Sequence, residues 1–145
     1  MIDGYSAYKQ TDINTARPRK IVLMLYDGAI GFLNRSVEYA VKKDIKNKNI
    51  FLNKARDIIQ ELNNSLNTEI GGEFAFHLRR LYFFMNRHLL RANLENDSKA
   101  IREVIQLLSS LREAWEDAYR QQTGPGAPPH GQIEIRSYRQ PGIRI

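Results

Sequence analysis

The sequence predicts an all-α protein, an antiparallel up-down four-helix bundle over residues 18–122, flanked by residues 1–17 and 123–145. Three observations predict it. The chain has 145 residues, which is enough for one domain with a substantial core. Four segments carry apolar residues at three- and four-residue steps, and none shows the alternation of a half-buried strand. The links between these segments are short, and short links join antiparallel helices.

The first two helices are expected on either side of the polar stretch "KKDIKNKN". We expect the first to open at Pro18, because a proline suits the first helical turn. Its periodic apolar positions are Val22, Leu25, Tyr26, Ala29, Leu33, Val37 and Ala40. The second is expected to end near residues 71–72, and its apolar positions are Phe51, Ala55, Ile58, Leu62 and Leu66.

The third and fourth helices are expected on either side of "ENDS", where Asp97 or Ser98 is a suitable N-cap. The third helix carries Phe74, Leu78, Leu81, Tyr82, Met85, Leu89 and Ala92. The fourth carries Ile101, Val104, Ile105, Leu108, Leu111, Trp115 and Ala118.

The two flanking segments lack this periodicity. Residues 1–17 are polar with spaced Tyr5, Tyr8 and Ile13, a pattern too irregular for a long helix. Residues 123–145 begin with the Gly/Pro-rich "TGPGAPPHGQ" and continue as "IEIRSYRQPGIRI". This tail suits either a short strand or hairpin, or a disordered end.

The composition narrows the function classes. The chain has no cysteine, which excludes disulfides, thiol catalysis and thiolate-bound metal centres. Its start does not resemble a secretory signal, and no apolar run approaches the roughly 18 residues that span a bilayer. We therefore expect a cytoplasmic protein without membrane insertion. The net charge of +6 allows anionic partners but names none.

No arrangement of residues indicates catalysis. His77 and His88 share a helix face but lie about 16 Å apart along the axis, too far for one metal ion. Glycine-rich phosphate loops and nucleophile elbows are absent from the sequence. We expect no enzyme activity, no cofactor and no metal.

An arginine stripe in the third helix raises an alternative function. Arg80, Phe84, Arg87 and Arg91 share one stripe, with Arg79 and Phe83 beside it. Basic side chains between aromatic ones can bind nucleic acid. A solvated arginine face is the favoured interpretation, because nucleic-acid binders carry a denser basic surface.

Apolar residues in three of the helices exceed what a bundle core needs. The run from Ile21 to Tyr26 is apolar throughout, and "LYFFM" and "IFL" add further such windows. A bundle helix needs only about three apolar residues in seven. Three interpretations stay open: a broad core with a few exposed side chains, a groove for a partner helix, or a self-associating face.

Several stretches resemble the flagellin-specific export chaperones of bacteria, the FliS family. They cover roughly residues 5–120 in the family's order, and they are "AYKQTDINTARP", "LMLYDGAI", "KARDIIQELNNSLN", "GGEFA", "LYFFMNRHLLRANLEND" and "AIREVIQLLSSLREAW". The resemblance implies a helical bundle that binds the disordered C-terminal segment of flagellin. It also implies that the chaperone prevents premature polymerisation and delivers its client to the flagellar export gate.

The resemblance also implies roles for particular residues. A flagellin-binding groove from the first three helices would contain Ile21, Leu23, Met24, Tyr26, Ile30, Phe51, Leu52, Phe83 and Phe84. Residues 1–17 would form a cap that shares the client's surface, with Tyr5, Tyr8 and Ile13 in the cap and in docking at the export gate. Asp27 would contact this cap, and Gly28 would allow close helix approach. A co-chaperone or a flagellin regulator is a further expected partner, and nucleic acid is not.

Overall fold

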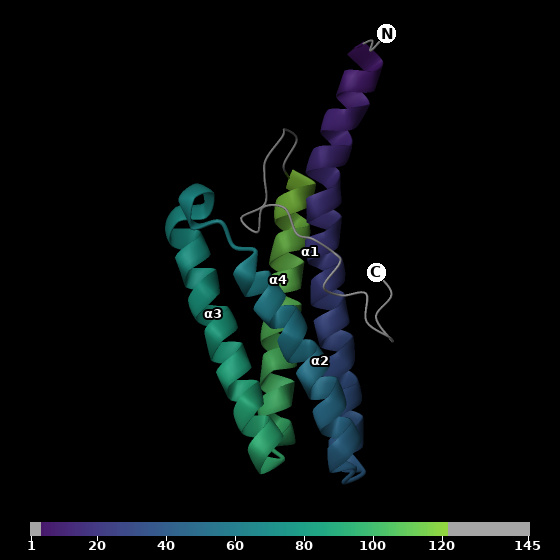
Figure 1. Cartoon of the computed structure of the whole chain (residues 1–145), viewed down its shortest axis with the longest axis vertical. Coiled ribbons are helices and arrows are strands. Elements are labelled where there is room, and N and C mark those ends of the chain that lie inside the picture. The colour runs from purple at the N-terminus through teal and green to yellow at the C-terminus, as the bar shows by residue number, and fades with distance from the viewer. Residues whose placement is uncertain (1–3, 122–145) are drawn as a thin grey trace.

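The computed structural model describes the backbone of residues 4–121 and the side chains of residues 18–67 and 71–121. This part of the chain consists of four helices, α1 (Gly4–Val41), α2 (Ile45–Asn64), α3 (Thr68–Glu95) and α4 (Ser98–Gln121), and contains no strand. Figure 1 shows the helices running alternately down and up. The predicted all-α, antiparallel four-helix bundle is confirmed. The C-terminal tail lies outside the described residues.

Each helix packs against two neighbours. α1 lies between α2 and α4, and α3 closes the bundle by contacting α2 and α4. The core between them is mainly apolar, and all four helices contribute to it. Its largest fully buried apolar side chains are Leu25, Tyr26, Leu33, Leu52, Ile58, Ile59, Leu62, Leu78, Tyr82, Met85 and Leu89.

α1 begins at Gly4 rather than at Pro18, so the expectation of an irregular segment before the bundle was wrong for residues 4–17. No glycine or proline occurs between Gly4 and Pro18, so no breaker ends the helix there. Pro18 lies inside the helix, where it removes one backbone donor. Figure 1 shows the first turns of α1 extending past the end of α4. Helical turns beyond the end of α4 need no apolar stripe that faces it, which fits the missing periodicity.

Side-chain caps fix the starts of α2 and α4. Asp44 accepts a hydrogen bond from the backbone N–H of Asn47 at 3.2 Å and opens α2. The Oδ1 atom of Asp97 accepts from the N–H groups of Lys99 (3.1 Å) and Ala100 (3.2 Å). Of the two predicted caps for α4, Asp97 is therefore the one used.

The link between α2 and α3 contains an additional turn of helix. α2 ends at Asn64, earlier than the predicted end at residues 71–72, and α3 starts at Thr68. Gly72 then breaks α3 with φ 56° and ψ −135°, in a region where only glycine avoids strain. The Gly71-Gly72 pair is thus a break, as the sequence indicates, but it separates a short first turn from the long part of α3.

Two contacts fix how α2 sits against its neighbours. A Cβ atom at Gly28 would lie 3.3 Å from Cδ1 of Ile58, so glycine allows a close approach of α1 and α2 at this position. Lys48 is fully buried, and its Nζ donates to the carbonyls of Ala92 (3.1 Å) and Asn93 (3.5 Å) near the end of α3. Burial lowers the pKa of this ammonium group, while the helix dipole at that end favours a cation.

Candidate functional site: apolar surface outside the core

The nine residues predicted to line a flagellin-binding groove do not form one surface. Ile21, Tyr26 and Leu52 are buried in the core, so they are not open to a partner in this structure. Phe83 and Phe84 are each 52% exposed on α3. The others are partly buried, namely Leu23, Met24, Ile30 and Phe51.

Phe51 is covered by side chains of this chain itself. Its ring stacks on Tyr39 with centroids 5.6 Å apart and lies 6.0 Å from the ring of Phe32. The guanidinium of Arg35 sits 4.3 Å from the Phe51 ring centroid, and the Lys54 ammonium lies 5.5 Å from it. Phe51 therefore stabilises the contact between α1 and α2, and little of it is free for a partner.

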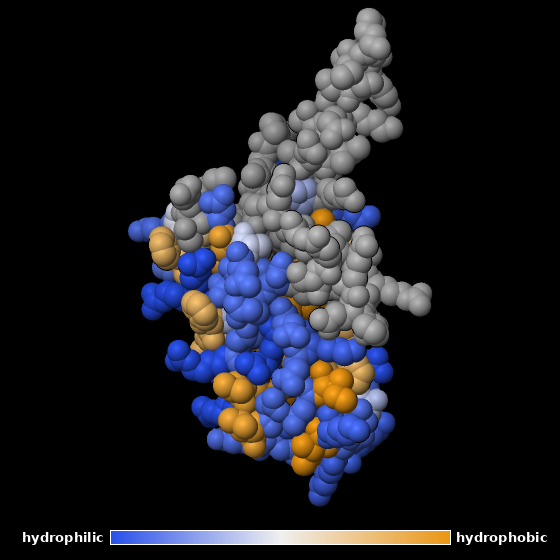
Figure 2. All heavy atoms as spheres, in the orientation of Figure 1, coloured by the Kyte–Doolittle hydropathy of each residue, from blue (hydrophilic) through white to orange (hydrophobic). Residues whose placement is uncertain are grey.

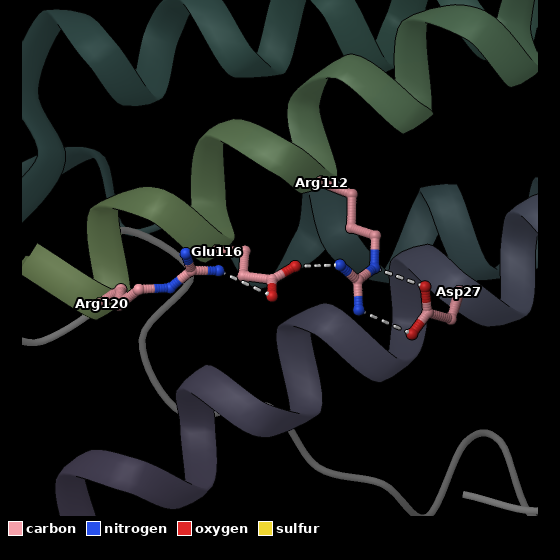
Figure 3. A network of polar contacts seen from close by, with 4 residues as sticks. All are labelled: Asp27, Arg112, Glu116 and Arg120. Atoms are coloured by element: carbon pink, nitrogen blue, oxygen red, sulfur yellow. Dashed lines mark hydrogen bonds and ion pairs between the residues drawn. The ribbon is translucent and has the colours of Figure 1, made fainter.

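An ionic clasp joins α1 to α4 (Figure 3). Arg112 of α4 donates from Nε and Nη2 to the two carboxylate oxygens of Asp27, at 2.5 and 3.2 Å. Nη1 of Arg112 also donates to Glu116, whose other oxygen accepts from Arg120 at 3.0 Å. Asp27 thus contacts α4, while its expected contact with residues 1–17 involves side chains outside the described ones and stays a prediction.

The hydrogen bonds of the clasp shift the pKa values of two of its groups. The hydrogen bond to Asp27 raises the pKa of Arg112, and the hydrogen bond from Arg112 lowers the pKa of Glu116. Both changes favour the charged forms of Arg112 and Glu116. The side chains are partly exposed, which makes the clasp a weak source of stability and a means of fixing the register of α1 on α4.

Apolar side chains lie beside the clasp. Leu23 and Ile30 lie four and three residues from Asp27, on the same face of α1, and Ile105 lies one heptad before Arg112 on α4. All three pack against the core while keeping part of their surface exposed. We call this surface, with Leu23, Asp27, Ile30, Ile105 and Arg112, the α1–α4 seam.

The opposite side of α4 carries a second seam, against α3. His88 Nε2 lies 2.8 Å from Glu103 Oε2, and the ring of Phe84 stacks on His88 with centroids 5.2 Å apart. Nearer the other end of the bundle, Phe74 is 54% exposed and meets Trp115 edge-on. We call these residues, Phe74, Phe84, His88, Glu103 and Trp115, the α3–α4 seam. α4 thus has accessible aromatic or aliphatic side chains on both sides.

A polar relay lies in the core beneath these seams. Trp115 Nε1 donates to the Tyr26 hydroxyl at 3.1 Å, and that hydroxyl lies 2.5 Å from the hydroxyl of Tyr82. The relay joins α1, α3 and α4. Burial raises the pKa of Tyr26 to about 12, and burial next to Tyr26 raises the pKa of Tyr82 well above its ordinary value. Both phenols are therefore neutral hydrogen-bonding groups, and the predicted groove residue Tyr26 has a structural role here.

Among the described side chains, most of the exposed large apolar ones are on α3, and four of them share one side of this helix. Phe76, Phe83 and Leu90 repeat every seven residues and Leu94 follows four later, all exposed on this face. We call these four residues the α3 stripe. Figure 2 shows apolar side chains between hydrophilic ones along the side of the molecule where α3 lies. Of this set, only Phe83 was among the predicted groove residues, although the seven-residue spacing of the other positions was a usable signal.

Arginines accompany the α3 stripe. Arg80, Arg87 and Arg91 lie on the same side of the helix, and Arg79 borders it. Arg91 pairs with Glu95 at 3.6 Å. Within residues 18–67 and 71–121, no carboxylate forms an ion pair with Arg79, Arg80 or Arg87. The predicted arginine stripe is thus a solvent-exposed face that also carries aromatic and aliphatic groups.

The described side chains include no group of three histidine, cysteine, aspartate or glutamate residues that could hold a metal ion. Over residues 4–121, none of the helices is long and apolar enough to cross a membrane. What the described part of the chain does offer is a bundle with a filled core and additional accessible apolar surface. Such surface is typical of proteins that bind other polypeptides.

Comparison with known proteins identifies the family. The family described as "Flagellar protein FliS" matches residues 1–122. The chain is 39% identical to the flagellar secretion chaperone FliS of Bacillus subtilis (strain 168) over 114 residues, covering 79% of this chain and 84% of that protein. It is 42% identical to the FliS chaperone of Salmonella typhimurium (strain LT2) over 118 residues, covering 78% and 87% of the two chains. For the FliS chaperone of Campylobacter jejuni the identity is 36% over 120 residues, covering 83% and 94%.

The chain belongs to the FliS family of flagellar secretion chaperones. The resemblance stated from the sequence motifs is confirmed. Its relatives are named as chaperones, which supports a role in flagellar export and confirms the expectation that the protein is not an enzyme.

Proposed function

We propose that this chaperone binds the disordered C-terminal segment of flagellin along the two seams of α4. Bound in this way, the segment cannot pair with other flagellin subunits, so the chaperone prevents premature polymerisation. The complex forms in the cytoplasm and is delivered to the flagellar type III export apparatus. The family membership supports the export role, and the accessible apolar side chains support the mode of binding.

One observation carries the proposal: the bundle has a complete apolar core, and large apolar side chains still lie outside it on both sides of α4. Leu23 and Ile30 lie on the α1 side, and Phe74 and Phe84 lie on the α3 side. A segment that contacts both sides must wrap around α4. A disordered segment can do this, because it folds on the surface that it covers.

Two opposing free-energy terms, apolar burial and the ordering of the client, make such binding reversible. Apolar burial along the seams stabilises the complex, while ordering the client costs several kcal/mol of the gross contact energy. The client segment has no stable fold of its own when it is free. It is therefore released in an unfolded, export-competent state whenever a partner binds the chaperone or the client more tightly.

The first turns of α1 are proposed to dock at the export gate and to act as the cap, with Tyr5, Tyr8 and Ile13 as contact residues. Support comes from the family resemblance and from the position of residues 4–17 on the same continuous helix as Leu23 and Ile30. A helix that carries both surfaces would couple client binding to docking. Replacing Tyr8 by alanine should reduce flagellin secretion without weakening client binding, because a cap that shares the client's surface competes with the client.

Two adjacent phenylalanines provide a matched test of the client surface. Phe83 and Phe84 are equally exposed, at 52%, but Phe84 lies in the α3–α4 seam and Phe83 in the α3 stripe. Covering half of a phenylalanine removes about 100 Å² of apolar surface from water, worth up to about 2.5 kcal/mol. Phe84→Ser should therefore weaken binding of a flagellin C-terminal peptide by about tenfold or more in titration calorimetry. Phe83→Ser should change it by less than about threefold, and equal losses in both variants would refute the assignment.

A further inference from the structure

We propose that the α3 stripe is a second docking surface, which binds an acidic amphipathic helix of a protein other than the client. Phe76, Phe83, Leu90 and Leu94 form this surface, together with the arginines beside them. The proposal concerns a face of the bundle that the client surface on the two α4 seams does not use.

The shape of the stripe fits a helix. Phe76, Phe83 and Leu90 are spaced by seven residues, the repeat at which two α-helices keep the same faces in contact. From Phe76 to Leu94 the stripe extends about 27 Å at the rise of an α-helix, which suits a partner helix of about five turns. All four side chains of the stripe are exposed, so no other helix of the bundle covers it.

The charge of the stripe selects the partner. Arg80 and Arg87 alternate with Phe83 and Leu90 at three- and four-residue steps. Neither arginine has a carboxylate partner among the described side chains of the chain. A helix with apolar residues in the middle of its face and glutamates or aspartates beside them would cover the stripe and pair with both guanidinium groups.

The same charges argue against two other occupants. In a second copy of this chain, Arg80 and Arg87 would face a stripe that also carries unpaired arginines, and like charges across an interface are repulsive. A nucleic acid would satisfy the arginines, but its phosphates would leave the aliphatic side chains of Leu90 and Leu94 exposed, at 42% and 79%. An acidic amphipathic helix satisfies both kinds of side chain.

The test uses two synthetic amphipathic peptides with the same apolar positions, spaced for a helix, and with either glutamates or lysines beside them. Each is labelled with a fluorophore and titrated with the full chain, while fluorescence anisotropy reports binding. The glutamate peptide should bind at least about tenfold more tightly than the lysine peptide, with an affinity that falls as salt is added. Equal affinities for the two peptides would overturn the proposal.

Matched variants locate the binding. Phe83→Ser should weaken binding of the glutamate peptide about tenfold. Arg87→Gln should weaken this binding about two- to fivefold, as expected for the loss of one exposed ion pair. Two control variants, Phe84→Ser and Arg102→Gln on the exposed face of α4, should change the affinity for the glutamate peptide by less than about twofold. Circular dichroism confirms that each variant is folded. Losses in the two control variants that equal those in the stripe variants would overturn the proposal.

Two further measurements decide between occupants. A single-stranded oligonucleotide that competes with the glutamate peptide at comparable concentration would assign the stripe to nucleic acid and overturn the proposal. Dimers in sedimentation velocity that Phe83→Ser abolishes would assign it to a second copy and also overturn it. Because client binding is measured separately with the flagellin peptide, a failure here leaves the proposed function testable by itself.

Discussion

The relay of Tyr26, Tyr82 and Trp115 gives a sharp test of how the core is held together. Tyr26→Phe removes one hydroxyl oxygen and keeps the ring. The indole N–H of Trp115 then loses the acceptor that lies 3.1 Å away, and the Tyr82 hydroxyl loses the partner at 2.5 Å. Both groups lie in a core where Tyr26 and Tyr82 are fully buried, so water does not replace the missing bonds.

The expected loss follows from the two broken hydrogen bonds. A hydrogen bond in a protein contributes about 0.5–1.5 kcal/mol to stability, so the loss of the two together should lower the free energy of unfolding by about 1–3 kcal/mol. This is a large share of the stability of a domain of this size, which is typically about 5–15 kcal/mol.

Urea denaturation measures this directly, because Trp115 is the only tryptophan of the chain and its fluorescence reports on the relay itself. The midpoint should fall while the dependence on urea stays the same. Tyr39→Phe is the control, since Tyr39 is partly buried on the same helix and stacks on Phe51 by its ring. A Tyr26→Phe protein within about 0.5 kcal/mol of the parent would refute the reasoning.

Three further predictions concern stability. The pKa of Tyr26 is raised to about 12 from the ordinary 10.0, so the contribution of the neutral phenol to stability is complete below pH 10 and is lost as the pH rises toward 12. Between neutral pH and about pH 11, the free energy of unfolding of the parent should therefore fall by about 1.4 kcal/mol more than that of Tyr26→Phe, as measured by denaturation. Gly31→Ala should raise the melting temperature, gaining about 0.5–1 kcal/mol from helix propensity in open space, whereas Gly28→Ala should gain less because its Cβ would crowd Ile58. Asp97→Ala should cost about 1 kcal/mol by removing the α4 cap, and an unchanged melting temperature would contradict that role.

Much of the fold was predictable because helix periodicity depends on local spacing. The core positions of α4, such as Val104 and Leu108, could be identified from their three- and four-residue steps alone. The Asp97 cap follows equally from local chemistry. The start of α1 was not predictable in this way. The first turns of α1 extend past the end of α4 (Figure 1), and a proline inside a helix has the same local sequence pattern as one at its start.

The candidate surface was harder to predict than the core. Apolar excess in the sequence shows that some side chains lie outside the core, but the rotation of each helix decides which ones. Tyr26 and Phe83 illustrate this: both were expected on the groove, yet one is buried in the relay and the other is exposed on the α3 stripe. The clasp of Asp27 and Arg112 joins residues 85 positions apart, a contact that no local pattern indicates.

The most direct test of the central claim is a calorimetric titration of the full chain with a peptide of the last helical segment of the organism's own flagellin. It is carried out at several temperatures and at low and high salt. Wrapping of the α4 seams predicts micromolar or tighter binding, a negative heat-capacity change from apolar burial, and little change with salt. Absence of binding to the folded protein, or an affinity that falls steeply with salt, would contradict the account.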